Sequence, residues 1–148
     1  MPVDKTKVSV RLLSPQDDRG RFNCGDIELD RFFQRFAGQN QFRHYIGTTY
    51  IAHIQDQIAG FVTVSTGEMT AKKINKVTKK KLPDYPLPIL RIARLAVDKN
   101  YQGFGIGKLL LKSMLELALE LKNRVGCVGV VADAKASAIN FYKNFGFL

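Results

Sequence analysis

The stretch I-L-R-I-A-R-L-A-V-D-K-N-Y-Q-G-F-G-I-G-K, which runs from Ile89 to Lys108, decides the fold of this chain. Its first part, Ile89 to Val97, is too apolar for an exposed loop and predicts a buried strand. Arg91 and Arg94 interrupt that strand. One side or one end of the strand must therefore reach polar surroundings.

Three alternating glycines, Gly103, Gly105 and Gly107, follow this strand and lead directly into an amphipathic segment typical of a helix. Glycine lets the backbone approach a ligand closely, and the free amides at the start of a helix attract negative charge. We therefore expect an anionic ligand at this loop, a phosphate in the first place.

Three common phosphate-binding loops do not match this spacing. A P-loop needs a hydroxyl residue after its lysine, and Lys108 is followed by Leu109. A Rossmann fingerprint reads G-x-G-x-x-G, whereas this loop reads G-x-G-x-G after Gln102. A kinase glycine-rich loop requires H-R-D and D-F-G elements, and the chain contains neither.

The pattern that does match is Q-x-x-G-x-G, formed by Gln102, Gly105 and Gly107 after a strand that ends in L-A-V-D. A second element, A-I-N-F-Y-K-N-F-G-F, covers Ala138 to Phe147. Together they resemble the GNAT acetyltransferase superfamily, whose motif A wraps the pyrophosphate of acetyl-coenzyme A and whose C-terminal element supplies a tyrosine. A glycine turn and a core tyrosine arising by chance would not explain both elements at once.

This resemblance implies an α/β fold, the GNAT fold, in which helices flank a mixed, mostly antiparallel central sheet. A chain of 148 residues fits a single domain over residues 1–148. The family usually adds another strand after the Gly-Phe pair, so we expect this chain, which ends at Leu148, to lack that last strand.

The resemblance also implies a reaction, in which an amine attacks the thioester of acetyl-CoA directly and coenzyme A thiolate leaves. Tyr142 matches the position that protonates the thiolate, a general-acid role. The alternative, which the motif disfavours, is a core ring with a hydrogen-bonded hydroxyl. No general base is identifiable, and Glu68 is a weak candidate.

Lys135 stands where many members carry a cofactor-contacting asparagine. The expected cofactor-binding residues are Leu95, Ala96, Val97, Gln102, Gly103, Phe104, Gly105, Ile106, Gly107, Lys108, Lys135, Asn140 and Tyr142.

The charge of the chain favours a polyanionic partner. Lysine and arginine number 23 against 13 aspartate and glutamate, a formal net charge of +10. A lysine cluster without any acid lies between Ala71 and Leu82 and is either a solvated face or a contact surface for a phosphate backbone. The expected nucleic-acid contacts are Lys72, Lys73, Lys76, Lys79, Lys80, Lys81, Arg91 and Arg94.

The N-terminal third narrows the resemblance to one branch of the superfamily. Phe22 to Phe33, F-N-C-G-D-I-E-L-D-R-F-F, and the run P-L-P-I-L-R-I-A-R-L-A-V-D look like the toxins of bacterial toxin–antitoxin pairs, which acetylate aminoacyl-tRNA. That likeness implies aminoacyl-tRNA as acceptor, a small ribbon-helix-helix antitoxin as partner, and a homodimer. Uncharacterised relatives share the N-terminal motif, so the toxin role is a hypothesis.

Two other functions stay open. A housekeeping GNAT enzyme would acetylate a small amine, a polyamine or a protein N-terminus, and an acidic or aromatic pocket near Glu68, Tyr45 and Tyr50 would support it. A nucleic-acid-binding module with an inactive acetyl-CoA site would bind RNA but not the coenzyme, and the intact loop and Tyr142 disfavour it.

Composition sets the remaining expectations. Cys24 and Cys127 form no disulfide framework, and neither they nor His44 and His53 have metal-site spacing, so we expect no metal. The N-terminus lacks the apolar stretch of a signal peptide, and no run of about 18 apolar residues suggests a membrane span. We expect a cytoplasmic protein that has no membrane contact.

Periodicity predicts the remaining elements. A helix capped by Asp26 should bury Leu29, Phe32, Phe33 and Phe36, and a second helix should bury the stripe Ile106, Leu110, Met114, Leu117, Ala118 and Leu121. The expected strands are Val8–Leu12, a hairpin of Tyr45–Ile54 and Ile58–Ser65, and Gly126–Ala132, with a last helix over Ala136–Phe145.

Overall fold

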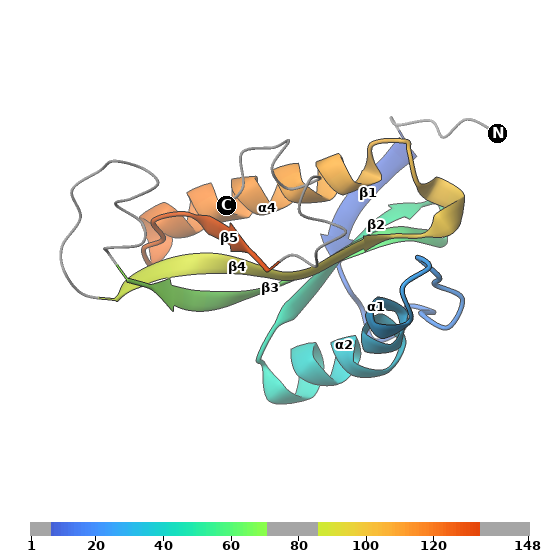
Figure 1. The fold of residues 1–148 in the computed structure, drawn as a ribbon, viewed down its shortest axis with the longest axis horizontal. Coiled ribbons are helices and arrows are strands. Elements are labelled where there is room, and N and C mark those ends of the chain that lie inside the picture. The colour runs from blue at the N-terminus through green and yellow to red at the C-terminus, as the bar shows by residue number, and fades with distance from the viewer. Residues whose placement is uncertain (1–6, 71–85, 134–148) are drawn as a thin grey trace.

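The computed structural model describes residues 7–70 and 86–133, and within them the chain forms a five-stranded sheet (Figure 1). The strand order follows the sequence, with three antiparallel contacts and a parallel contact between the last two strands. The α/β fold with a mostly antiparallel sheet is therefore confirmed. The strands are β1 (Val8–Leu12), β2 (Thr48–Ile54), β3 (Gln57–Met69), β4 (Leu87–Val97) and β5 (Val130–Ala132).

Helices lie on both faces of this sheet (Figure 1). The long helix α4 (Ile106–Arg124) covers one face, and α1 (Ile27–Arg31) with α2 (Ala37–Gln39) covers the other. Within α4 the predicted stripe is confirmed, because Ile106, Leu110, Met114 and Ala118 are buried and Leu117 and Leu121 pack against that core. No helix among the described residues is long and apolar enough to cross a membrane.

The helix predicted from Asp26 forms, but it is not a regular α-helix. The Asp26 carboxylate accepts hydrogen bonds from the amides of Glu28 (3.0 Å) and Leu29 (3.2 Å), so the predicted cap is confirmed. Turns of π-helix follow at Phe32–Phe36 and Asn40–His44. A π turn contains an extra residue, which rotates later side chains off the α-helical stripe. Phe36 is consequently 45% exposed, and its predicted place in the core is wrong.

A cluster of phenylalanines fastens this helical segment to the sheet. Phe61 of β3 stacks on Phe33 with ring centroids 4.5 Å apart and the rings 8° from parallel. Phe22 meets both rings edge-on, at 4.8 Å from Phe33 and 5.3 Å from Phe61. Each buried ring contributes about 1.5–3 kcal/mol through loss of contact with water. The segment before α1 is therefore fixed against the same sheet face as α1 itself.

Several predicted strand boundaries differ from the structure, and the central strand begins at Leu87 instead of Ile89. The first hairpin strand begins at Thr48, because Tyr45 adopts a left-handed conformation (φ 55°) that ends the preceding helical turn. The second hairpin strand is longer than predicted and reaches Met69, because it pairs with β4 from Gly60 to Met69. Only Val130–Ala132 of the predicted last strand is regular. The predicted Ala136–Phe145 helix and the lysine cluster lie outside the described residues.

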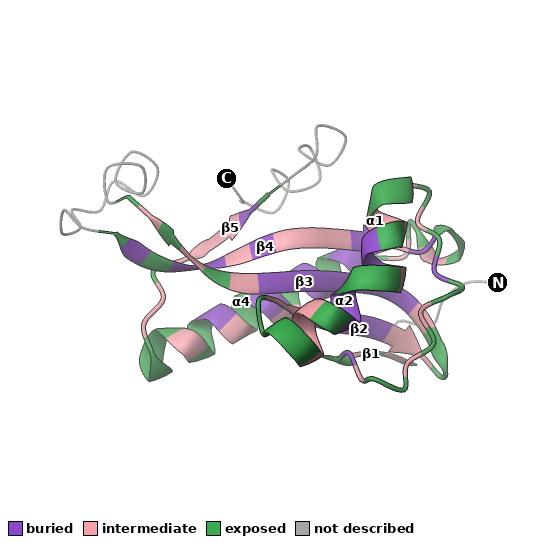
Figure 2. Cartoon of the chain, turned by 90° about the horizontal axis from the view of Figure 1, so that it is seen from below, coloured by how far each residue is buried: buried purple, intermediate pink, exposed green. Residues whose placement is uncertain are grey.

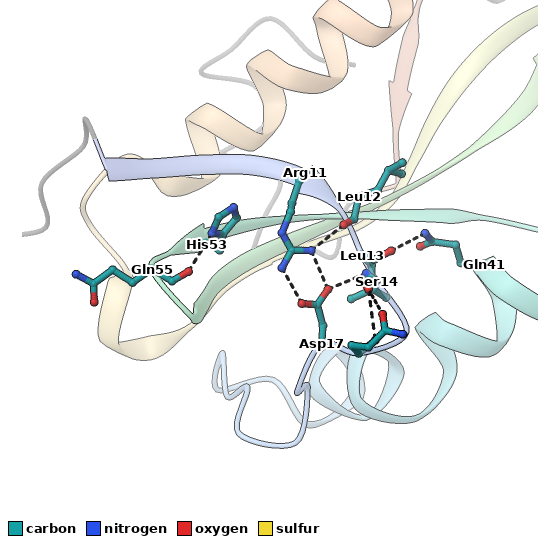
Figure 3. Close-up of polar contacts among 9 residues, drawn as sticks. Arg11, Leu12, Leu13, Ser14, Asp17, Gln41, His53 and Gln55 are labelled. Atoms are coloured by element: carbon teal, nitrogen blue, oxygen red, sulfur yellow. Dashed lines mark hydrogen bonds and ion pairs between the residues drawn. The ribbon is translucent and has the colours of Figure 1, made fainter.

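A bidentate ion pair fixes the turn after β1 (Figure 3). Arg11 donates to the two carboxylate oxygens of Asp17 at 2.7 and 2.9 Å, and the Ser14 amide donates to the same carboxylate at 2.7 Å. The hydrogen bond from Arg11 is the largest cause that lowers the pKa of Asp17 below its ordinary value of 3.8. The lowered pKa means that the ionised carboxylate stabilises the folded state.

Replacing Asp17 with Asn should remove this pH-dependent stabilisation. Above the ordinary aspartate pKa the wild type should exceed Asp17→Asn by about 1 kcal/mol in free energy of unfolding. This difference should shrink as the pH falls through the folded-state pKa, where Asp17 becomes neutral. Urea unfolding from pH 7 to pH 2.5 measures it, with the exposed neighbour Asp18→Asn as control. A difference that is constant with pH would contradict the ion-pair account.

Gly60 of β3 lies in close contact with β4 and α4. A Cβ built there would lie 2.9 Å from the Ala96 carbonyl oxygen and 3.2 Å from both Ile106 Cγ2 and Leu110 Cδ1. Real Cβ atoms essentially never lie within 3.0 Å of a neighbour, and the nearest atom here is backbone. Only glycine allows this spacing.

Gly60→Ala should therefore destabilise the protein by about 1–3 kcal/mol, the usual cost of overpacking. Gly129→Ala is the matched control, because a Cβ there meets no atom within 4 Å, and it should change stability by less than about 0.5 kcal/mol. Chemical denaturation of the two variants makes the comparison. Equal stabilities would show that the sheet and α4 can separate without cost.

Candidate functional site

The glycine loop lies between the end of β4 and the start of α4. A single 3-10 turn (Lys99–Tyr101) follows Asp98, and the loop then passes through two left-handed glycines, Gly103 (φ 85°) and Gly105 (φ 83°). Gly105 is the cap of α4 and has no side chain to satisfy the first amides of the helix. Those amides have no partner within the helix, and they lie at the positive end of its dipole. These free amides could bind an anion, and the anion site at this loop stays a prediction.

The residues of the loop differ in their exposure to solvent. Ile106 and Gly107 are buried, Phe104 is half-buried, and Gly103, Gly105 and Lys108 are exposed. Their backbone amides, together with the Lys108 ammonium group at the first turn, form a positively polarised surface. Such a surface fits a pyrophosphate group.

Gln102 holds the loop in place through its side chain. Its amide nitrogen donates to the carbonyl oxygen of Val97 at 2.9 Å and to that of Cys24 at 3.1 Å. Both side-chain N–H groups therefore bind protein carbonyls, and the side chain connects the loop to the end of β4 and to the N-terminal segment. Gln102 thus shapes the site through its side chain.

Asp98 is a supporting residue that the sequence analysis did not assign to the site. It is 7% exposed and accepts hydrogen bonds from the amides of Asn23 (3.1 Å) and Asn100 (3.0 Å), while the Lys99 amide donates to the Asn23 carbonyl (2.8 Å). The only sequence signal was a single acid between an apolar strand and a polar turn. Asp98 fixes the N-terminal segment beside the loop.

Directly before this loop, one edge of β4 pairs with no strand among residues 7–70 and 86–133. Within those residues the strand pairs with β5 at Leu90–Ile92, and the Asp133 amide makes the last described contact, to the Ile92 carbonyl (2.9 Å). On the other side of β4, Thr63 pairs with Arg94 but Val64 pairs with Ile92, which leaves Ala93 as a bulge. A bulge reverses which backbone groups face each neighbouring strand.

The backbone groups of Leu95 and Val97 therefore point away from β3. The Asp98 amide donates a hydrogen bond to the Ala59 carbonyl of β3 (2.8 Å). Because the N–H and C=O groups of successive residues point to opposite sides of a strand, those of Ala96 also face β3. Those of Leu95 and Val97 face the β5 side. Among the described residues, only the Gln102 side chain binds a backbone group on that edge. The predicted role of the Leu95 and Val97 amides in binding the pantetheine arm and the oxyanion stays a prediction, and the backbone of Ala96 is directed to β3.

The two predicted arginines of β4 lie on the face that α1 and α2 partly cover. Arg91 forms a long ion pair with Asp133 (3.4 Å), and the guanidinium carbon of Arg94 lies 3.8 Å from the centroid of the Phe32 ring. In Figure 2 the helices cover one end of this face and leave the part of β3 and β4 nearer β5 without a described helix. Lys135, Asn140, Tyr142 and the lysines of residues 72–81 lie outside the described residues.

The cysteines offer no nucleophile for a covalent route. Burial raises the pKa of Cys24 to about 11, so its thiol is almost entirely protonated at neutral pH. Cys127 is half-buried, and its thiol points to the Gly129 carbonyl (3.3 Å). The described residues contain no group of three or more His, Cys, Asp or Glu side chains that could hold a metal ion.

A polar cleft that the sequence analysis did not predict lies beside the 3-10 turn. Its volume is about 430 Å³, and Arg21, Asn23, Asp30, Gln34 and Lys99 are among the residues that line it. The N-terminal segment forms one wall and the turn that precedes the glycine loop forms the other. A sequence pattern could not reveal it, because its walls are more than 60 residues apart along the chain.

Proteins of known function share this architecture. A "tRNA-acetylating toxin" of Mycobacterium tuberculosis is 27% identical over 140 residues, which are 93% of this chain and 82% of the toxin. The structure of AtaT complexed with acetyl-methionyl-tRNAfMet is 26% identical, with a TM-score of 0.84 over 95% of this chain and 86% of that one. The crystal structure of AtaTR bound with AcCoA is 27% identical, with a TM-score of 0.80 over 97% and 87%.

The acetyltransferase (GNAT) domain family matches residues 46–147, which include the glycine loop, the open edge of β4 and the C-terminal element with Tyr142. The match spans more than half of the chain and agrees with the expected fold. The protein therefore belongs to the GNAT acetyltransferase family, the acetyl-CoA-dependent N-acetyltransferases.

Proposed function

We propose that this protein transfers the acetyl group of acetyl-CoA to the amino group of aminoacyl-tRNA, as the toxin of a toxin–antitoxin pair. The observation that carries the proposal is the likeness, over 95% of the chain, to AtaT complexed with acetyl-methionyl-tRNAfMet. The tRNA-acetylating toxin of M. tuberculosis and the net charge of +10 support it.

The described residues fit the acetyl donor at two places. The amides from Gly103 to Lys108, which have no side-chain cap, would hold the pyrophosphate. The Leu95 and Val97 amides, which face away from β3, would bind the pantetheine arm and the oxyanion that forms when the amine attacks the thioester. Preorganised amides stabilise such charge without having to reorient during the reaction.

Proton transfer completes the reaction. The attacking amine loses a proton as the new C–N bond forms, and the thiolate of coenzyme A gains one as the C–S bond breaks. We assign the second role to Tyr142 from its place in the C-terminal motif. An α-amine, whose pKa is close to 8, is partly neutral at cellular pH, so no strong general base is required.

The same proposal includes partners and a location. AtaT has been solved bound to the C-terminus of the antitoxin AtaR, and by analogy we infer a small antitoxin, of the ribbon-helix-helix type, and a homodimer for this chain. A tRNA acceptor implies action in the cytoplasm. The rival function, acetylation of a small amine, a polyamine or a protein N-terminus, uses the same donor site and differs only in the acceptor.

Gln102→Ala should weaken acetyl-CoA binding about tenfold while it leaves the fold intact. The variant loses the hydrogen bonds to Val97 and Cys24, each worth about 1 kcal/mol, and the loop then has to be ordered by the ligand. Isothermal titration with acetyl-CoA measures the affinity. Asn123→Ala, an exposed amide in the last turn of α4, is the matched control. Equal affinities would show that the side chain does not organise the donor site.

An acetyl-transfer assay tests the reaction. Labelled acetyl-CoA and a pool of charged tRNA should give labelled aminoacyl-tRNA, and Tyr142→Phe should slow transfer about a hundredfold because a general acid is lost. Tyr101→Phe is the control and should keep wild-type rates, because its hydroxyl bonds to the exposed Gln57. Acetyl-CoA binding without label in tRNA would refute the proposed acceptor and favour small amines or peptides.

A further inference from the structure

Arg94 presents a guanidinium group with a fixed orientation on the α1–α2 face of the sheet. Its backbone pairs with Thr63, directly after the bulge at Ala93, and its guanidinium carbon lies 3.8 Å from the centroid of the Phe32 ring. The residue is half-buried. One flat side of the guanidinium thus rests on an aromatic ring.

The ring beneath Arg94 is itself held firmly. Phe32 is only 5% exposed and stacks over Phe61, with centroids 6.2 Å apart, and Phe61 stacks in turn on Phe33. A cation over such a ring is attracted by the negative face of the ring, and a planar guanidinium loses little further freedom when it binds a ligand. Arg94 is therefore preorganised.

Arg94 has no acidic partner among the described residues. Among the described residues, the arginines in ion pairs are Arg11, Arg91 and Arg124. No carboxylate of the described chain is paired with Arg94, although it is half-buried. A guanidinium bound on its flat side keeps its N–H edge, whose fork geometry matches a phosphate.

The position of Arg94 relates it to the open edge of β4. Leu95 is the next residue, and its backbone groups face the β5 side. The side chain of Leu95 packs into the core under α4, whereas that of Arg94 lies on the opposite face, against Phe32. An acceptor that reaches the edge from the α1–α2 face would pass Arg94.

We propose that Arg94, held flat on Phe32, binds a phosphodiester of the single-stranded 3′ end of the acceptor RNA and so positions the amino group at the open edge of β4. This inference rests on the proposed function and names a positioning residue within it. A purely structural role, in which Arg94 only covers Phe32, predicts loss of stability and of donor binding together with loss of RNA binding.

Binding of a short RNA hairpin with a single-stranded 3′ end tests this without catalysis. Arg94→Gln should weaken binding of that hairpin about tenfold or more. The slope of log Kd against log salt concentration should fall by about one, as expected for one lost phosphate contact. A hairpin that lacks the single-stranded nucleotides should bind both proteins equally. Arg94→Lys keeps the charge without the planar fork and should restore only part of the affinity. Arg124→Gln, which removes the same charge from the far end of α4, is the control.

Enzyme kinetics and acetyl-CoA binding distinguish a positioning role of Arg94 from a role in folding. Arg94→Gln should raise KM for charged tRNA with little change in kcat, in acetyl-CoA affinity or in Tm. Equal hairpin binding by Arg94→Gln and Arg124→Gln, absence of hairpin binding by the wild type, or parallel loss of acetyl-CoA affinity and Tm would each overturn the inference. This test is independent of the test of the proposed function. If the wild type binds the hairpin through Arg94 but does not acetylate charged tRNA, the proposed reaction is refuted and the RNA contact of Arg94 is not.

Discussion

The backbone of β4 has to satisfy hydrogen bonds on two sides, and the rest of the structure follows from how it does so. Up to Ile92 the strand has a partner on each side, β3 and β5. The bulge at Ala93 then turns the groups of Leu95 and Val97 toward the β5 side, where no strand among the described residues pairs with them. Backbone polar groups in a protein interior require partners. A ligand that supplies them completes the sheet, so binding there extends the hydrogen-bond pattern that forms the fold.

The two faces of the sheet serve different parts of the site. On one face α4 lies so close to the strands that Gly60 cannot bear a side chain, which fixes the start of the helix and its free amides relative to the end of β4. On the other face the phenylalanine cluster holds α1 and supports Arg94. Donor and acceptor would therefore meet at an edge whose position both faces determine.

Local patterns predicted the parts of this structure that depend on local physics. The helix cap at Asp26, the stripe of α4 and the glycine loop each follow from spacing, and the structure has all three. Sequence could not reveal three features that depend on tertiary packing. They are the π turn that exposes Phe36, the hydrogen bond from the Asn23 amide to Asp98, and the contact of the Arg94 guanidinium with the Phe32 ring. The bulge at Ala93 was also invisible, because pairing with β3 defines it.

The contacts of Asn23 with Asp98 and Lys99, and of Cys24 with Gln102, join segments some 75 positions apart. Contacts of such long range form late, because the intervening chain must be ordered first. During synthesis the segment around Asn23 leaves the ribosome well before its partners exist. We therefore expect the glycine loop to be completed only after the hairpin and β4 are in place, so that the acetyltransferase acquires its donor site near the end of its own folding.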